Sequence, residues 1–156
     1  MSSGFVKVLL FSALIVVFVA ADTRAQNITA AINGGEVTRG LQARGTVTMS
    51  IPGGLHVNSN RPSSEYSIPT TVNITASGAK VGSVTYPRGA NRKFEFSENA
   101  INVYQGTIRF PFSVKVPSNF KGDVIRLRAV VRYQACTNEV CYPPKTKDIT
   151  FTARVR

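Results

Sequence analysis

The amino-acid sequence predicts an all-β protein, on three observations. Beyond residue 25 no apolar period of about 3.6 residues is sustained, so no amphipathic helix is indicated. Short runs rich in β-branched and aromatic residues recur instead, and several alternate apolar with polar residues. Gly, Pro, Asn and Ser separate these runs about every 8–12 residues. About seven to nine such strands predict an immunoglobulin-like β-sandwich, with a different sandwich topology as the alternative.

The strands can be assigned in order along the chain. Seven are expected, at residues 45–51, 66–76, 80–86, 92–96, 106–116, 124–133 and 148–155. Turns are expected at Pro52-Gly53-Gly54, Ser77-Gly78, Pro87-Arg88-Gly89, Pro117-Ser118-Asn119 and Lys121-Gly122. In strand 106–116 every second residue is apolar: Ile108, Phe110, Phe112, Val114 and Val116. In strand 124–133 the arginines fall on one face and the apolar residues on the other, so one face should be buried.

Residues 1–25 have the pattern of a secretory signal peptide. Lys7 precedes an apolar stretch over residues 8–21, and Ala21 or Ala25 could precede the cleavage site. This stretch is shorter than the about 20 residues of a membrane span, and an uncleaved anchor is the alternative. We expect residues 26–156 to form a single domain without a transmembrane segment. It would be periplasmic or secreted, in a compartment where disulfides persist.

The charge and the histidine count argue against several functions. The chain carries a formal net charge of +11, but its basic residues are scattered and form no motif. We therefore interpret the charge as favouring solubility and do not expect nucleic-acid binding. His56 is the only histidine, which argues against a His-Cys-carboxylate zinc site and a catalytic triad. No metal or cofactor is expected, and His56 is assigned to packing or hydrogen bonding.

The only two cysteines, Cys136 and Cys141, lie close together near the C-terminus. On one extended strand they would be roughly 16 Å apart, because a strand rises about 3.3 Å per residue. A disulfide needs Cα atoms about 4.4–6.8 Å apart, so bonding would require the chain to reverse between them. Residues 137–140 would then be a four-residue hairpin loop, and Asn138 would suit a position with positive φ.

Such a pair is either a local staple or a redox couple, and the spacing alone does not decide between them. Arg132, Lys145 and Lys147 would favour a thiolate, whereas Glu139 would oppose it. Tyr133 and Tyr142 flank the cysteines. They could restrict access or form a docking surface, or they could simply pair across the hairpin as strand aromatics.

Three segments carry a family resemblance. The segment Tyr133-Gln134-Ala135-Cys136, followed by Cys141-Tyr142-Pro143-Pro144, resembles the active-site hairpin of the N-terminal periplasmic domain of the DsbD thiol:disulfide interchange family. The run Gly54-Leu55-His56-Val57-Asn58-Ser59-Asn60-Arg61-Pro62 is similar to one found in stand-alone relatives. Asn102-Val103-Tyr104-Gln105-Gly106 resembles a segment with a Tyr just ahead of a core strand.

The resemblance implies an immunoglobulin-like domain whose Cys136 and Cys141 match the catalytic cysteines of the family. Electrons would come from a thioredoxin-like or membrane-embedded donor protein and pass to oxidised periplasmic proteins, a protein-disulfide reductase activity. Family members shield the pair with a loop that bears an aromatic residue. That loop would lie between Arg88 and Asn102 here, with Phe94 or Phe96 as the shielding ring.

Two hypotheses follow from these observations. The first is a periplasmic thiol–disulfide exchange domain, in which Cys136 and Cys141 cycle between dithiol and disulfide. The second is a non-catalytic immunoglobulin-like interaction module that binds a partner through its surface and carries an inert hairpin disulfide.

Overall fold

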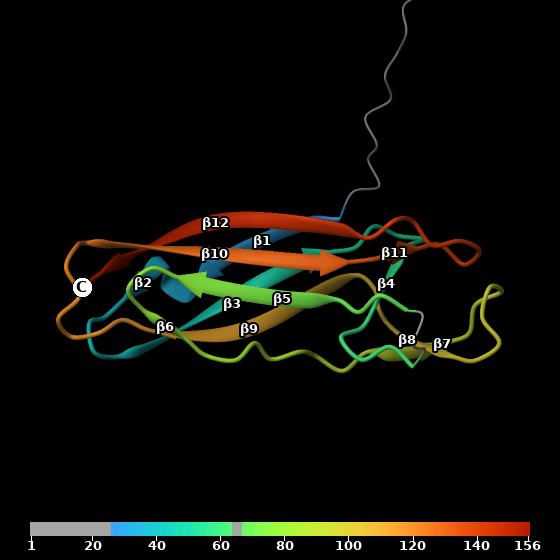
Figure 1. The fold of residues 1–156 in the computed structure, drawn as a ribbon, viewed down its shortest axis with the longest axis horizontal. Helices are drawn as coiled ribbons and strands as arrows, with labels where there is room; N and C mark the ends of the chain where they lie inside the picture. The colour runs from blue at the N-terminus through green and yellow to red at the C-terminus, as the bar shows by residue number, and fades with distance from the viewer. Residues whose placement is uncertain (1–25, 64–66) are drawn as a thin grey trace, which may run out of the picture.

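The computed structural model describes residues 26–63 and 67–156 of the protein (Figure 1). These residues form twelve strands in three sheets, with one short 3₁₀ turn, η1 (Asn33–Gly35), and the all-β prediction is confirmed. The count exceeds seven to nine because β2, β4, β6, β7 and β11 span only two or three residues each. The expected signal peptide at residues 1–25, and Tyr66 in the second expected strand, lie outside the described residues.

Three four-stranded sheets build the fold. The first has the order β1 (Asn27–Ile32), β3 (Gln42–Ser50), β9 (Thr107–Lys115) and β6 (Lys80–Val81). The second has the order β2 (Glu36–Val37), β12 (Lys145–Val155), β10 (Val124–Tyr133) and β5 (Thr71–Ala76). The third, which we call the tip sheet, has the order β11 (Ala135–Cys136), β4 (His56–Asn58), β8 (Ile101–Tyr104) and β7 (Ala90–Arg92). Figure 1 shows the tip sheet at the end of the molecule opposite to the C-terminus.

The first two sheets pack face to face around the main hydrophobic core. Phe112 of the first sheet meets Phe151 of the second edge to face, with ring centroids 6.2 Å apart. Val47 and Phe110 of the first sheet, and Leu127 of the second, are fully buried in this core. Removal of these side chains from water is the main force that holds the two sheets together.

Strand β10 has the bounds that its alternation predicts. Its apolar residues from Ile125 to Tyr133 are buried at every second position, and its arginines point to solvent. Arg128 forms an exposed ion pair with Asp148 on the neighbouring strand. Gly45 of β3 leaves no room for a side chain, because a Cβ there would overlap the ring of Phe112.

Three expected strands are shorter than predicted. The one at residues 80–86 pairs as a strand only over Lys80–Val81, because Pro111 on the facing strand β9 has no N–H to continue the ladder. Thr85 N still donates to the Pro111 carbonyl, at 2.8 Å, so the segment stays alongside β9. The described part of 66–76 becomes a strand only from Thr71. Of residues 92–96 only Arg92 belongs to a strand, since the chain turns where Ser97 N donates to the Phe94 carbonyl, at 3.2 Å.

Two features attach the tip sheet to the sandwich. Strand β11 follows β10 after a single intervening residue, Gln134, so the second sheet leads directly into the tip. Strand β4 follows a turn in which Gly54 has a φ of 78°, a conformation that residues with a Cβ rarely adopt. The expected turn at Pro52-Gly53-Gly54 therefore forms and delivers His56 to the tip sheet.

Candidate functional site

Cys136 and Cys141 form a disulfide bond, with their Cα atoms 4.0 Å apart. The chain reverses between them as expected. Thr137 N donates to the Val140 carbonyl at 2.8 Å, and the Thr137 hydroxyl accepts from the backbone N–H groups of Glu139 and Val140. Asn138 does not adopt the positive φ that its residue type would tolerate, since every residue with positive φ in the described chain is a glycine. The Thr137 side chain organises this turn instead.

The two cysteines differ sharply in their access to solvent. Cys136 is 0% exposed, whereas Cys141 belongs to the exposed residues of the turn. The difference follows from their positions, because Cys136 lies on β11 inside the tip sheet and Cys141 lies outside any sheet, paired only to Cys136. A molecule approaching from solvent therefore meets Cys141 first.

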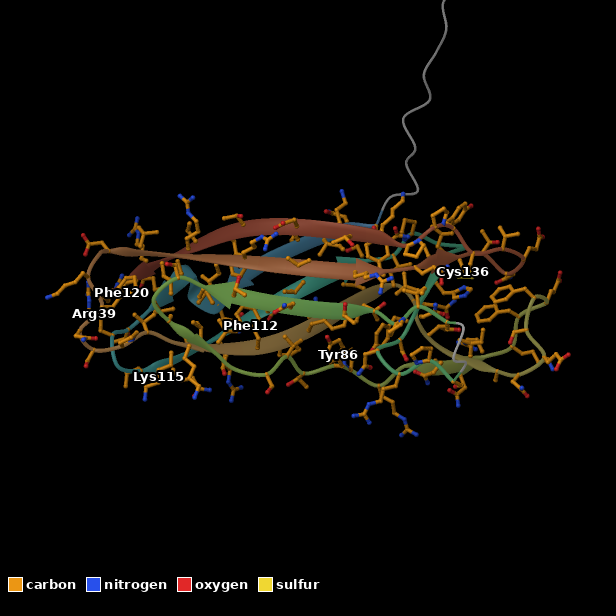
Figure 2. The ribbon with its side chains drawn as sticks, in the orientation of Figure 1. Arg39, Tyr86, Phe112, Lys115, Phe120 and Cys136 are labelled. Atoms are coloured by element: carbon orange, nitrogen blue, oxygen red, sulfur yellow. A yellow bond between two sulfur atoms is a disulfide. The ribbon has the colours of Figure 1, made fainter. Side chains whose placement is uncertain are left out.

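His56 lies directly opposite Cys136 across the antiparallel pair of β4 and β11. Residues opposite each other in such a pair project to the same face, with Cβ atoms about 4.5–5.5 Å apart. The same rule applies to Cys136 and Cys141, which face each other as an isolated antiparallel bridge. The side chains of Cys141, Cys136 and His56 therefore lie in one row on one face of the tip sheet. Figure 2 places Cys136 at this end of the molecule, far from Arg39 and Phe120 at the other end.

An aromatic loop packs on this row at His56. We call residues 93–100, between β7 and β8, the cap loop. Its Phe94 ring stacks on the His56 ring with centroids 3.9 Å apart and planes within 10° of parallel. Phe96 stacks on Phe94 in turn, with centroids 5.4 Å apart. Phe94 is only 7% exposed and Phe96 is 40% exposed, so the inner ring anchors the loop and the outer ring faces solvent.

An open cavity of about 750 Å³ lies between the cap loop and the cysteine hairpin. Its lining includes Cys141 and Gln134 from the hairpin, and Phe96 and Glu98 from the loop. The structure thus brings both phenylalanines expected from the sequence close to the disulfide region. Phe96 is the one that shares a cavity with the exposed cysteine.

Hydrogen bonds hold the hairpin against β4. The Asn58 side-chain amide donates to Gln134 Oε1 at 3.3 Å, and Gln134 Nε2 donates to the Tyr142 carbonyl at 3.2 Å. Tyr104, on the adjacent strand β8, donates its hydroxyl proton to Asn60 Oδ1 at 2.7 Å. These contacts fix the position of the segment that carries His56.

The two tyrosines that flank the cysteines have different environments. Tyr133 is 0% exposed and pairs with Lys145 in the ladder, not with Tyr142. Its hydroxyl is buried with no hydrogen-bond partner among the described residues. Tyr142 is half-buried and donates its backbone N–H to the Ala135 carbonyl at 2.8 Å. Tyr142, and not Tyr133, therefore offers surface next to the exposed cysteine.

The electrostatics of the site centre on His56. Burial lowers the pKa of His56 from 6.5 to about 4, so the ring is neutral at neutral pH. Its Nε2 atom is buried and has no partner within the described part of the chain. The basic residues that we expected to favour a thiolate, Arg132, Lys145 and Lys147, are exposed on β10 and β12 and do not line the cavity.

Sequence reasoning did not assign His56, Asn58 or Gln134 to the site. His56 and Asn58 belong to the run 54–62, but nothing in the sequence showed that this run pairs with a hairpin almost eighty residues later.

Among residues 26–63 and 67–156, no group of three or more His, Cys, Asp or Glu side chains could hold a metal ion. That part of the chain also contains no helix long and apolar enough to cross a membrane.

The chain resembles a described protein family and several solved structures. The family described as "Thiol:disulfide interchange protein DsbD, N-terminal" matches residues 29–153. The N-terminal periplasmic domain of ScsB from Proteus mirabilis has a similar structure, with a TM-score of 0.54 at 15% identity. The match covers 87% of this chain and 49% of the ScsB chain, so this chain spans about half the length of that one. The GAE domain of GGA2p from Saccharomyces cerevisiae aligns with a TM-score of 0.46 at 10% identity, over 85% of this chain and 94% of that one. Comparison with curated protein sequences finds no match.

Proposed function

This chain belongs to the family of the N-terminal domain of the thiol:disulfide interchange protein DsbD, and from that premise we propose that it carries electrons through Cys136 and Cys141. The observation that carries the proposal is the asymmetry of the pair. One cysteine is exposed beside an open cavity, and the other is fully buried opposite His56, on which the aromatic loop stacks. A disulfide that served only as a staple would stabilise the fold little at this position, because it closes a loop of about six residues and so constrains the unfolded chain weakly.

The exchange would run in two halves. A donor thiolate attacks Cys141 Sγ, the disulfide breaks, and its electron pair leaves on Cys136 Sγ. A second donor thiol then attacks the mixed disulfide and releases Cys141 as a thiolate, so two electrons and two protons enter the domain. In the other half, the Cys141 thiolate attacks the disulfide of an oxidised protein. Cys136 then attacks Cys141 Sγ, which restores the internal disulfide and releases the reduced product.

The family suggests the partners and the compartment. The electron donor would be a thioredoxin-like or membrane-embedded protein, and the acceptors would be oxidised periplasmic proteins. The domain would then act in the periplasm as a protein-disulfide reductase component. Phe96 would shield Cys141 from other thiols, Phe94 would anchor the cap loop, and Tyr142 would belong to the docking surface.

The first test is the equilibrium reduction potential of the Cys136–Cys141 pair in glutathione or dithiothreitol buffers. We expect a value between about −180 and −270 mV, the range of known exchange proteins. A value well below about −300 mV is typical of structural disulfides. It would refute the proposal and leave the inert interaction module, which the full burial of Cys136 would then favour.

A second test uses two matched variants. Cys136→Ser keeps the exposed thiol but removes the resolving one, so it should accumulate covalent complexes with an oxidised partner protein. Cys141→Ser keeps only the buried thiol and should accumulate far fewer. Equal trapping by both variants would contradict the assignment of Cys141 as the attacking residue.

A further inference from the structure

The buried histidine beside the disulfide has no role in the exchange as described so far. His56 is 1% exposed, lies opposite Cys136 in the tip sheet, and carries a ring nitrogen without a partner in the described chain. Buried polar atoms without partners are uncommon in proteins and call for an explanation. The disulfide of the residue opposite His56 could not satisfy this nitrogen, because a disulfide has no proton to donate and is a poor acceptor.

Reduction changes what Cys136 requires. A thiolate formed at a fully buried position is unstable unless it is protonated or hydrogen-bonded, since burial penalises the charged form. In the opposite direction, the buried thiol must lose its proton before it can attack a mixed disulfide, because the thiolate is the nucleophile. Both steps need a proton donor or acceptor at Cys136.

We propose that His56 is the proton donor and acceptor for Cys136 during thiol–disulfide exchange. The inference rests on the proposed function, since it applies only if the pair cycles. When the disulfide is reduced, the neutral His56 ring takes up the proton that the second donor thiol loses and passes it to the leaving Cys136 sulfur, so the ring ends neutral. When the mixed disulfide is resolved, His56 accepts the Cys136 proton, the Cys136–Cys141 bond forms, and the proton leaves with the released thiol.

The charged groups on β7, the cap loop and the cysteine hairpin are exposed, unlike the buried His56. On β11 the only titratable side chain is Cys136 itself. Tyr104 of β8 lies opposite Val57, whose side chain projects to the other face from that of His56. The cap loop contributes Glu98 at the cavity, and the exposed Lys93 of this loop donates an ammonium N–H to the backbone carbonyl of Glu98 at 2.7 Å. Glu95 is also exposed and separates the two stacked phenylalanines in the sequence.

The stack also suggests a clean variant. Phe94 packs on the flat face of the His56 ring, so a phenyl ring at position 56 can keep this contact while it removes both nitrogens. His56→Phe therefore separates proton transfer from packing. His56→Gln is the second variant, because an amide can still hydrogen-bond but cannot take up a proton.

The experiment mixes the reduced protein with dithiobis(nitrobenzoate), an aromatic disulfide whose released thiolate is coloured. Attack by Cys141 releases a first equivalent at a rate proportional to the reagent concentration. Attack by Cys136 on the mixed disulfide then releases a second equivalent at a rate that does not depend on the reagent concentration. Cys136→Ser should release one equivalent only, which assigns the two phases.

We expect both His56 variants to leave the first phase unchanged and to slow the second at least tenfold at about pH 7, since general acid–base catalysis contributes about 10²–10⁴-fold. The deficit should shrink as the pH rises and Cys136 ionises without help. A second phase at the wild-type rate in either folded variant would overturn the inference, as would a deficit that persists at high pH. A wild-type protein that releases no second equivalent would instead refute the proposed function, and the inference with it.

Discussion

Removal of Phe94 should open the cap loop without unfolding the protein. Phe94 packs with Ile101 and Val103 in a small apolar cluster that is separate from the main core, and it stacks on His56. Truncation of a buried Phe to Ala costs about 3–5 kcal/mol in a main core, and we take the lower figure for a cluster this small. Because about 1.4 kcal/mol corresponds to a factor of ten, Phe94→Ala should raise the open population of the loop up to about 100-fold.

The assay is the rate at which dithiothreitol reduces the disulfide. If the closed loop restricts access to Cys141, this rate should rise several-fold in Phe94→Ala. It should stay below the 100-fold limit, because Cys141 is already partly accessible. Phe96→Ala should raise the rate with little effect on stability, since Phe96 is 40% exposed.

The matched control is Phe120→Ala, which truncates a half-buried aromatic ring at the opposite end of the molecule (Figure 2). It should lower the melting temperature and leave the reduction rate unchanged. Wild-type reduction rates in a folded Phe94→Ala protein would refute the reasoning, because the loop would then not guard the disulfide.

Three further predictions concern stability. Gly45→Ala should destabilise the protein by about 1–3 kcal/mol in urea unfolding, because the new methyl group would overlap the Phe112 ring; an unchanged midpoint would contradict this packing. Tyr133→Phe should leave stability unchanged or raise it, since it removes a buried hydroxyl without a hydrogen-bond partner among the described residues. Tyr104→Phe should lower stability by about 1 kcal/mol, because the Tyr104 hydroxyl is hydrogen-bonded. Equal losses of stability in the two variants would contradict these environments. The pKa of His56 is about 4 in the folded protein and about 6.5 in the unfolded chain. Between these pH values the unfolded chain binds more protons, so the free energy of unfolding should fall as the pH is lowered from 6.5 to about 4. This component should be absent from His56→Phe, and parallel urea midpoints of the two proteins across that range would count against it.

The sequence predicted the parts of the fold that depend on local pattern. Strand β10 has the predicted bounds because its strict alternation leaves one register that buries the apolar face. The cysteine hairpin was predictable because the reach of the chain required a reversal within four residues if the two cysteines were bonded. Turn propensity drew attention to Asn138, but it did not indicate that the Thr137 hydroxyl organises the turn.

What the sequence could not predict depends on contacts between distant segments. Residues 92–96 have the composition of a strand, yet Phe94 and Phe96 lie in a loop because their rings stack on a histidine from β4. The role of Pro111 in shortening β6 became clear only once β9 and β6 were known to be neighbours. His56 is the strongest case, since its position beside Cys136 follows from the pairing of β4 with β11 alone.

The unequal exposure of the two cysteines has a kinetic consequence. Of the two cysteines only Cys141 is exposed, so under the proposed function an electron donor and an electron acceptor would compete for the same small area at one end of the molecule. They could not be bound together, and the domain would have to release one before it meets the other. Steady-state turnover with two partners would then follow ping-pong kinetics, with parallel lines in double-reciprocal plots, and each partner in excess would inhibit the other.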